Sequence, residues 1–337
     1  MVKIMRKSII ALLVTSLVLS SCKDEFDISK LNEQGKISLC CFPSTVADTT
    51  WIEVTYSMPV VEGNAATNDL VAKNDVQIVY TVNGESRQVN KVSEQRQNKR
   101  PSIGSARYYV TGRHQPGDHV CITASEEYHK TVKAETVIPQ PCHIKAEDLR
   151  EVVIYSNSYG DFLNMWQLSA TFTDPAETQD YYAVRLCQMG IGQTYDHMTG
   201  AVGLDSTFVY HEISNESEPL LNLLSELDED FGFKSNYYQN FYIFSDAAIN
   251  GQTYTLHLNF TDNQYIVGHD FSRQFRAELY RITPETYRYL KSINDVDNNE
   301  LAQIGFSMLV PTYSNVTDGI GIVGGFALST TEWLSLR

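Results

Sequence analysis

The alternation of apolar and polar residues with period two runs through most of the chain, and it is typical of strands buried on one face. Residues 52–56 place three apolar side chains on one face and two polar ones on the other, and residues 254–260 have apolar side chains at every second position. The 20 Tyr residues and an aromatic content of 11% also favour strands. The sequence therefore predicts a mostly β protein.

The first half of this pattern predicts a compact sandwich. A strand at residues 76–80 leads to the turn Asn83–Gly84, and residues 87–92 return as the second strand of a hairpin. Two prolines at 139 and 141 end the strand pairing. We expect an Ig-like or transthyretin-like β-sandwich over residues 36–140, able to fold as residues 30–140, and a linker from about Pro139 to Glu151.

Residues 150–337 predict a larger β-rich domain with two short helices. One helix is expected at residues 219–227. The other begins at Thr283, where Thr is a suitable N-cap, Pro284 takes the first helical position and Glu285 lies in the first turn. The strands expected in this domain are residues 152–155, 166–172, 181–186, 208–213, 241–244, 253–260 and 275–282.

The N-terminus has the features of a signal peptide, expected over residues 1–21. Lys3, Arg6 and Lys7 precede an apolar stretch at residues 9–19, which is too short to span a bilayer as a helix. Small polar residues and Cys22 follow. The ending resembles a bacterial lipobox, in which the cysteine is acylated, for example with palmitate, and becomes the new N-terminus. The alternative is a secretory signal in which Cys22 is incidental.

The residues after Cys22 predict a tether at residues 22–35. It starts with the acidic stretch KDEFD, which resembles the tag that exports Bacteroidetes lipoproteins to the cell surface. An ordinary charged tether is the alternative. Acyl chains hold a protein on a membrane without a transmembrane segment. We therefore expect an outer-membrane, lipid-anchored protein that is exposed on the cell surface.

The net charge argues against nucleic acid as a partner. The chain has a formal charge of -15, and removal of residues 1–21 with their three positive charges would make it -18. Such a chain repels phosphate backbones.

Five cysteines follow Cys22, and an odd number cannot pair completely within one chain. They are Cys40, Cys41, Cys121, Cys142 and Cys187. Either Cys40 or Cys41 pairs with Cys121 or Cys142 in an oxidising compartment, or the five are free, buried thiols.

The chain has no motif that predicts a catalytic residue, a metal or a cofactor. It lacks the HExxH and GxSxG patterns, a P-loop, and paired CxxC spacing. The aromatic and amide residues Tyr237, Tyr238, Asn240 and Tyr242 form a candidate ligand-binding cluster, because rings stack on sugars and amides bond hydroxyls. The alternative is a strand that enters the core.

Five stretches resemble one family in their combination and order. They are GDHV at 117–120 with AETVIP at 134–139, DYY at 180–182, FSD at 244–246 with 251 and 254–260, LYRITPETY at 279–287 with 289–290, and NVTDGIGIVG at 315–324. This set is similar to the Bacteroidetes outer-membrane lipoproteins classed as domain of unknown function 4249. The family usually has Gly at the position of Asp318 and often Phe at that of Val323. The glycines of the last stretch also suggest a closing strand with a close backbone approach.

The resemblance implies a lipid anchor and a gene beside that of a TonB-dependent transporter, and it implies no reaction. We therefore expect a non-catalytic, ligand-binding accessory of a TonB-dependent outer-membrane transporter. Its ligand would be a small molecule, a peptide or a neutral glycan. The first alternative is an adhesin or structural surface protein. A glycan-degrading enzyme is a weaker one, since a sequence does not give the separation of a carboxylate pair.

Overall fold

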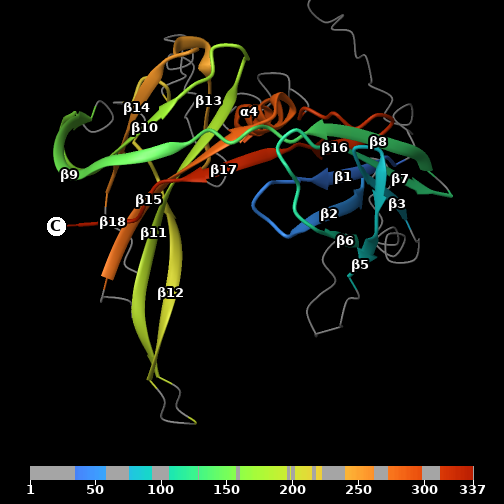
Figure 1. The fold of residues 1–337 in the computed structure, drawn as a ribbon, viewed down its shortest axis with the longest axis horizontal. Coiled ribbons are helices and arrows are strands. Elements are labelled where there is room, and N and C mark those ends of the chain that lie inside the picture. The colour runs from blue at the N-terminus through green and yellow to red at the C-terminus, as the bar shows by residue number, and fades with distance from the viewer. Residues whose placement is uncertain are drawn as a thin grey trace, which may run out of the picture. The chain divides into compact units, whose positions relative to one another are not determined.

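The computed structural model describes residues 35–57, 76–92, 106–127, 129–156, 160–195, 198, 202–214, 218–221, 240–261, 272–297 and 312–336 (Figure 1). Its strands are β1 (Ile37–Cys41), β2 (Thr49–Tyr56), β3 (Gln77–Val82), β4 (Glu85–Arg87), β5 (Val89–Lys91), β6 (Ala106–Thr111), β7 (His119–Glu126), β8 (His129–Val137), β9 (Ile144–Ser156), β10 (Asp161–Thr173), β11 (Tyr181–Tyr195), β12 (Val202–His211), β13 (Tyr242–Ser245), β14 (Thr253–Phe260), β15 (Ser272–Ile282), β16 (Ile320–Val323), β17 (Phe326–Thr330) and β18 (Leu334–Ser335). The described helices are α4 (Pro284–Asp297) and the short 3-10 helix η4 (Asp246–Ala248). The mostly β prediction is confirmed.

Two sheets enclose the first core. One has the strand order β16-β1-β2-β6-β5, and the other has the order β4-β3-β7-β8. Alternate residues of these strands fill the space between them, and Leu39, Ile52, Tyr80 and Ile122 are fully buried there. The turn Asn83–Gly84 joins β3 to β4 with positive φ at both residues, as a tight hairpin turn requires. One return strand is expected at residues 87–92, but the structure has two strands near these residues. β4 pairs with β3, whereas β5 pairs with β6 in the opposite sheet.

A strand from near the end of the chain completes the first of these sheets. β16 pairs with β1 in parallel, and Gly321 lies opposite Leu39. A Cβ atom added at Gly321 would lie 2.1 Å from the Leu39 carbonyl oxygen, so the expected close backbone approach is confirmed. The independent folding of residues 30–140 stays a prediction, and that fragment would lack β16.

The second core lies between a sheet of order β14-β10-β9 and one of order β12-β11-β15-β17. The seven strands expected after residue 150 all appear, as β9 to β15. β9 begins at Ile144, so the expected linker from about Pro139 to Glu151 is shorter than the prolines suggested. β13 pairs with the first residues of β11, and β12 pairs with the residues of β11 that follow them.

Helix α4 starts as the sequence predicts. The Thr283 carbonyl accepts a hydrogen bond from the Tyr287 N–H at 3.0 Å, and Pro284 is the first helical residue. Its Leu290 packs with Tyr280 and Ile282 on the outer face of the larger sheet, the face opposite the second core. Of the helix expected at residues 219–227, residues 219–221 form a turn and the rest lie outside the described residues.

The cysteines of residues 40–187 are free. This favours the alternative in which they are unpaired thiols over the one with a disulfide. Burial raises the pKa of Cys40 and of Cys187 to about 11, so both thiols are protonated at neutral pH. Within the described part of the chain, no helix is long and apolar enough to cross a membrane.

Candidate functional site

The structure places two of the four residues proposed to bind a ligand. Tyr242 is 3% exposed in the second core, and its hydroxyl oxygen accepts the Ile213 N–H at 2.7 Å. Asn240 has a positive φ of 59° and donates from Nδ2 to the Tyr210 carbonyl at 3.1 Å. The position of Tyr242 supports the alternative in which this segment enters the core, whereas Asn240 is half-buried. Tyr237, Tyr238 and the anchor residue Cys22 lie outside the described residues.

Asn240 leads to a group of side chains on the outer face of the larger sheet. Strand register places Cys187 opposite Tyr210 on one side and Arg276 on the other, and places Arg185 opposite Glu278. Because directly paired residues share a face, these side chains lie on one surface. The group comprises Arg185, Phe208, Tyr210, Phe241, Arg276 and Trp333, and is called the arginine–aromatic face below.

Arg185 contacts two aromatic rings of this face. Its guanidinium carbon is 3.3 Å from the Tyr210 ring centroid and 4.3 Å from that of Phe241. The Nε atom is buried and has no hydrogen-bond partner. Among the described residues, no acceptor or carboxylate contacts the guanidinium. The Asn240 amide ties the two ring-bearing segments together, since it bonds the Tyr210 carbonyl and precedes Phe241 in the chain.

The second arginine of the face is paired. Arg276 donates to Glu278 Oε1 from Nη2 at 2.6 Å and from Nε at 3.1 Å, while the Tyr280 hydroxyl donates to Oε2 at 2.7 Å. The Arg276 guanidinium also lies 4.5 Å from the Trp333 ring centroid. Glu278 is 2% exposed, and both of its oxygens are bonded. Glu278, which lies opposite Arg185 in the described ladder, is therefore hydrogen-bonded to Arg276 and Tyr280 instead.

Beyond the rings, the outer face continues as an apolar row on β12. Val202, Leu204 and Phe208 are 63%, 75% and 52% exposed. β15 ends its pairing with β11 at Ile191, so the ends of β11 and β12 extend past it as a two-stranded hairpin (Figure 1). Apolar side chains in such numbers on one exposed strand are typical of an interaction surface.

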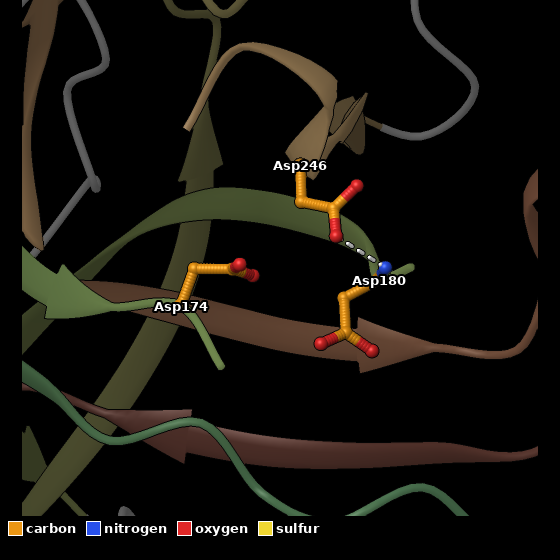
Figure 2. A group of neighbouring side chains, drawn as sticks. All are labelled: Asp174, Asp180 and Asp246. Atoms are coloured by element: carbon orange, nitrogen blue, oxygen red, sulfur yellow. Dashed lines mark hydrogen bonds between the residues drawn. The ribbon is translucent and has the colours of Figure 1, made fainter. Parts of the chain in front are cut away.

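A second cluster joins three buried aspartates. Asp174 follows β10, Asp180 precedes β11 and Asp246 begins η4, and one oxygen of each lies within 4.8 Å of the others (Figure 2). Carboxylate oxygens are the ligand type that hard divalent cations such as Ca²⁺ take. The cluster was not predicted, because Asp180 and Asp246 are 66 residues apart in the chain and no local pattern joins them.

Protein donors already bond all three carboxylates. Tyr182 and the Gly251 N–H donate to Asp174 at 2.6 and 3.0 Å. The Asp180 N–H donates to Asp246 at 2.7 Å, as Figure 2 shows. Burial raises the pKa of Asp246, and the charges of Asp174 and Asp180 add to the rise.

Arg281 supplies a positive charge to this cluster. Its Nε donates to Asp180 Oδ1 at 3.0 Å, its Nη2 also contacts that oxygen, and Nη2 donates to Thr178 at 3.1 Å. The arrangement connects the start of β11, the end of β15 and η4, so it is suited to holding these elements together.

A family model matches residues 23–332, which is nearly the whole chain. The chain belongs to the DUF4249 family. The family's description is a domain of unknown function, and no curated protein matches the chain. Functional inference for this DUF4249 protein therefore depends on the geometry described above.

The DUF4249 chain also has a hollow of about 330 Å³ beside the start of α4. Its lining includes His119, Glu135, Thr136, Thr283 and Glu285. His119 and Glu135 lie 3.8 Å apart, and both side chains are about half exposed. Because water surrounds both side chains, it screens the electrostatic interactions that this hollow offers a ligand.

Sequence reasoning selected one end of the arginine–aromatic face and missed the rest. It chose Asn240 from the aromatic segment, although Phe241 beside it lines Arg185. Arg185, Tyr210 and Arg276 occupy ordinary strand positions, and only the pairing of β11 with β12 and β15 brings them together. The sequence offers one usable signal for Arg185, which is a charged residue within the apolar run of residues 181–187.

Proposed function

We propose that this protein is a non-catalytic binding protein, lipid-anchored on the outer membrane and exposed at the cell surface, that serves as an accessory of a TonB-dependent transporter. The observation that carries the binding role is the exposed apolar row of β12 beside the arginine–aromatic face. Water-exposed apolar side chains along one strand favour contact with a partner or ligand. The N-terminal pattern ending in Cys22 supports the anchor.

An adhesin would use the same anchor and sandwiches, so the partner decides between the two roles. A transporter accessory has to contact a barrel, whereas an adhesin does not. Gentle detergent extraction of outer membranes, followed by affinity capture of the protein and mass spectrometry, distinguishes them. Capture of a TonB-dependent barrel supports the accessory role, and repeated recovery without one favours the adhesin.

The β12 row gives this experiment a matched pair of variants. Leu204→Ser removes an apolar side chain that is 75% exposed, so we expect little change in melting temperature. If the row contacts the barrel, the amount of barrel captured falls about tenfold, as for loss of one important interface side chain. Val153→Ser on β9 is the control, since Val153 is 66% exposed on a different hairpin. Equal loss in both variants, or no loss in either, would argue against β12 as the contact.

The anchor is tested separately. Cys22→Ala removes the thiol that a lipobox acylates, so the variant is expected to lose fatty-acid label and to leave the membrane fraction. Metabolic labelling with a clickable fatty acid, followed by fractionation, measures both effects. Equal labelling of the wild type and the variant would mean that Cys22 is incidental.

A further inference from the structure

The Arg185 guanidinium has a hydrogen-bond donor for which the described residues provide no acceptor. Its Nε atom is buried without an acceptor, which is costly for a charged donor. Glu278, its register neighbour, is bonded to Arg276 and Tyr280. Arg276 on the same face shows the contrast, because its Nε is bonded to a carboxylate.

We propose that Arg185 binds the carboxylate of a ligand, an inference that rests on the proposed binding function and assigns its chemistry. Tyr210 and Phe241 both lie against the guanidinium, and the described residues place no hydrogen-bond acceptor at its N–H edge. A carboxylate matches that edge with two parallel hydrogen bonds. The rings also fix the plane of the guanidinium before binding, which lowers the entropy lost on association.

A singly charged group fits this site better than a phosphate. The charges of Arg276 and Glu278 match each other, so Arg185 supplies the unmatched positive charge of this face. The whole chain carries a net charge of -15, which repels a dianion more strongly than a monoanion.

The surroundings favour an apolar group next to the carboxylate. Phe208 and Trp333 lie on the same face with ring centroids 6.1 Å apart, and the exposed Leu204 follows on β12. A free aromatic acid and the C-terminus of a peptide ending in an apolar residue share this chemistry. The experiment therefore includes both sources.

The test follows the arginine Nε–H signals of the full mature protein, labelled with ¹⁵N, by NMR. The probes are N-acetylphenylalanine, its neutral amide, a pentapeptide ending in phenylalanine with a free carboxylate, and inorganic phosphate. Arg185 is assigned from its loss in Arg185→Gln, and Arg276 is the internal reference, because Glu278 already occupies its Nε.

We expect N-acetylphenylalanine to shift the Arg185 signal saturably and to leave Arg276 nearly unchanged, while the amide has no effect. Arg185→Gln should weaken binding at least about tenfold, and Arg185→Lys should restore only part of it, since Lys keeps the charge without the planar edge. Tighter binding of the peptide would identify a peptide C-terminus as the source. No saturable shift with either carboxylate, a response to phosphate alone, or an equal shift of all arginines would overturn the inference. If a barrel is still captured in that case, the proposed function stands without this ligand.

Discussion

Replacing Gly321 by Ala is expected to lower the free energy of unfolding by about 3 kcal/mol or more. Gly321 has a φ of +110°, which an L side chain rarely adopts, and an added Cβ would lie 2.1 Å from the Leu39 carbonyl oxygen. The clash is with backbone, so no rotamer change relieves it. β16 would have to move away from β1, and the ladder that places Cys40 beside Ile322 would open.

Gly84→Ala is the matched control for this experiment. Gly84 also has a positive φ, +86°, but an added Cβ would meet nothing within 4 Å. It should therefore cost only the conformational strain, about 1–2 kcal/mol. Denaturant unfolding of both variants measures the difference, and hydrogen exchange of the Leu39 amide shows whether β1 is the part that loosens. Equal losses in the two variants would mean that β16 adapts without leaving β1.

The strands were predictable because their signal is local. One buried face imposes an alternating pattern, and residues 254–260 show that pattern directly as β14. The same holds for the tight turn at Asn83–Gly84 and for the N-cap and first-turn proline of α4, where a few adjacent residues determine the backbone.

Pairing between distant strands was not predictable in the same way. β1 and β16 are almost the whole described chain apart, and the glycines of residues 319–325 indicated only a close approach, without its partner. The arginine–aromatic face depends on the same long-range pairing. No local pattern distinguishes Arg185, which contacts two rings, from an arginine at a solvated strand position.

The aspartate cluster has the largest electrostatic consequence for stability. Arg281→Ala is expected to lower the free energy of unfolding at pH 7 by about 3–5 kcal/mol, because it leaves buried carboxylates without their cation. Arg107→Ala is the control: the Arg107–Glu53 pair is 3.0 Å long but exposed, so its loss should cost no more than about 1 kcal/mol. Thermal or denaturant unfolding measures both variants.

The pH dependence of this loss follows from Asp246. Because its pKa is raised in the folded state, ionisation of Asp246 opposes folding, so its favourable contribution is present at acidic pH and is lost as pH rises through the raised value. Removing Arg281 strengthens the repulsion from Asp174 and Asp180, so the variant should recover stability on acidification more than the wild type. Unfolding measured from neutral to mildly acidic pH tests this sign.

Asp246→Asn distinguishes an electrostatic role from a packing role of Arg281. The amide keeps a side-chain oxygen that can accept the Asp180 N–H, but the substitution removes one negative charge from the cluster. In the Arg281→Ala background it should restore a coupling energy of about 0.5–3 kcal/mol. If the loss were due to packing, Asp246→Asn would restore nothing. Ca²⁺ and a chelator should leave the wild-type melting temperature unchanged, since protein donors already bond these carboxylates; a rise with Ca²⁺ that Asp246→Asn abolishes would instead make the three aspartates a cation site.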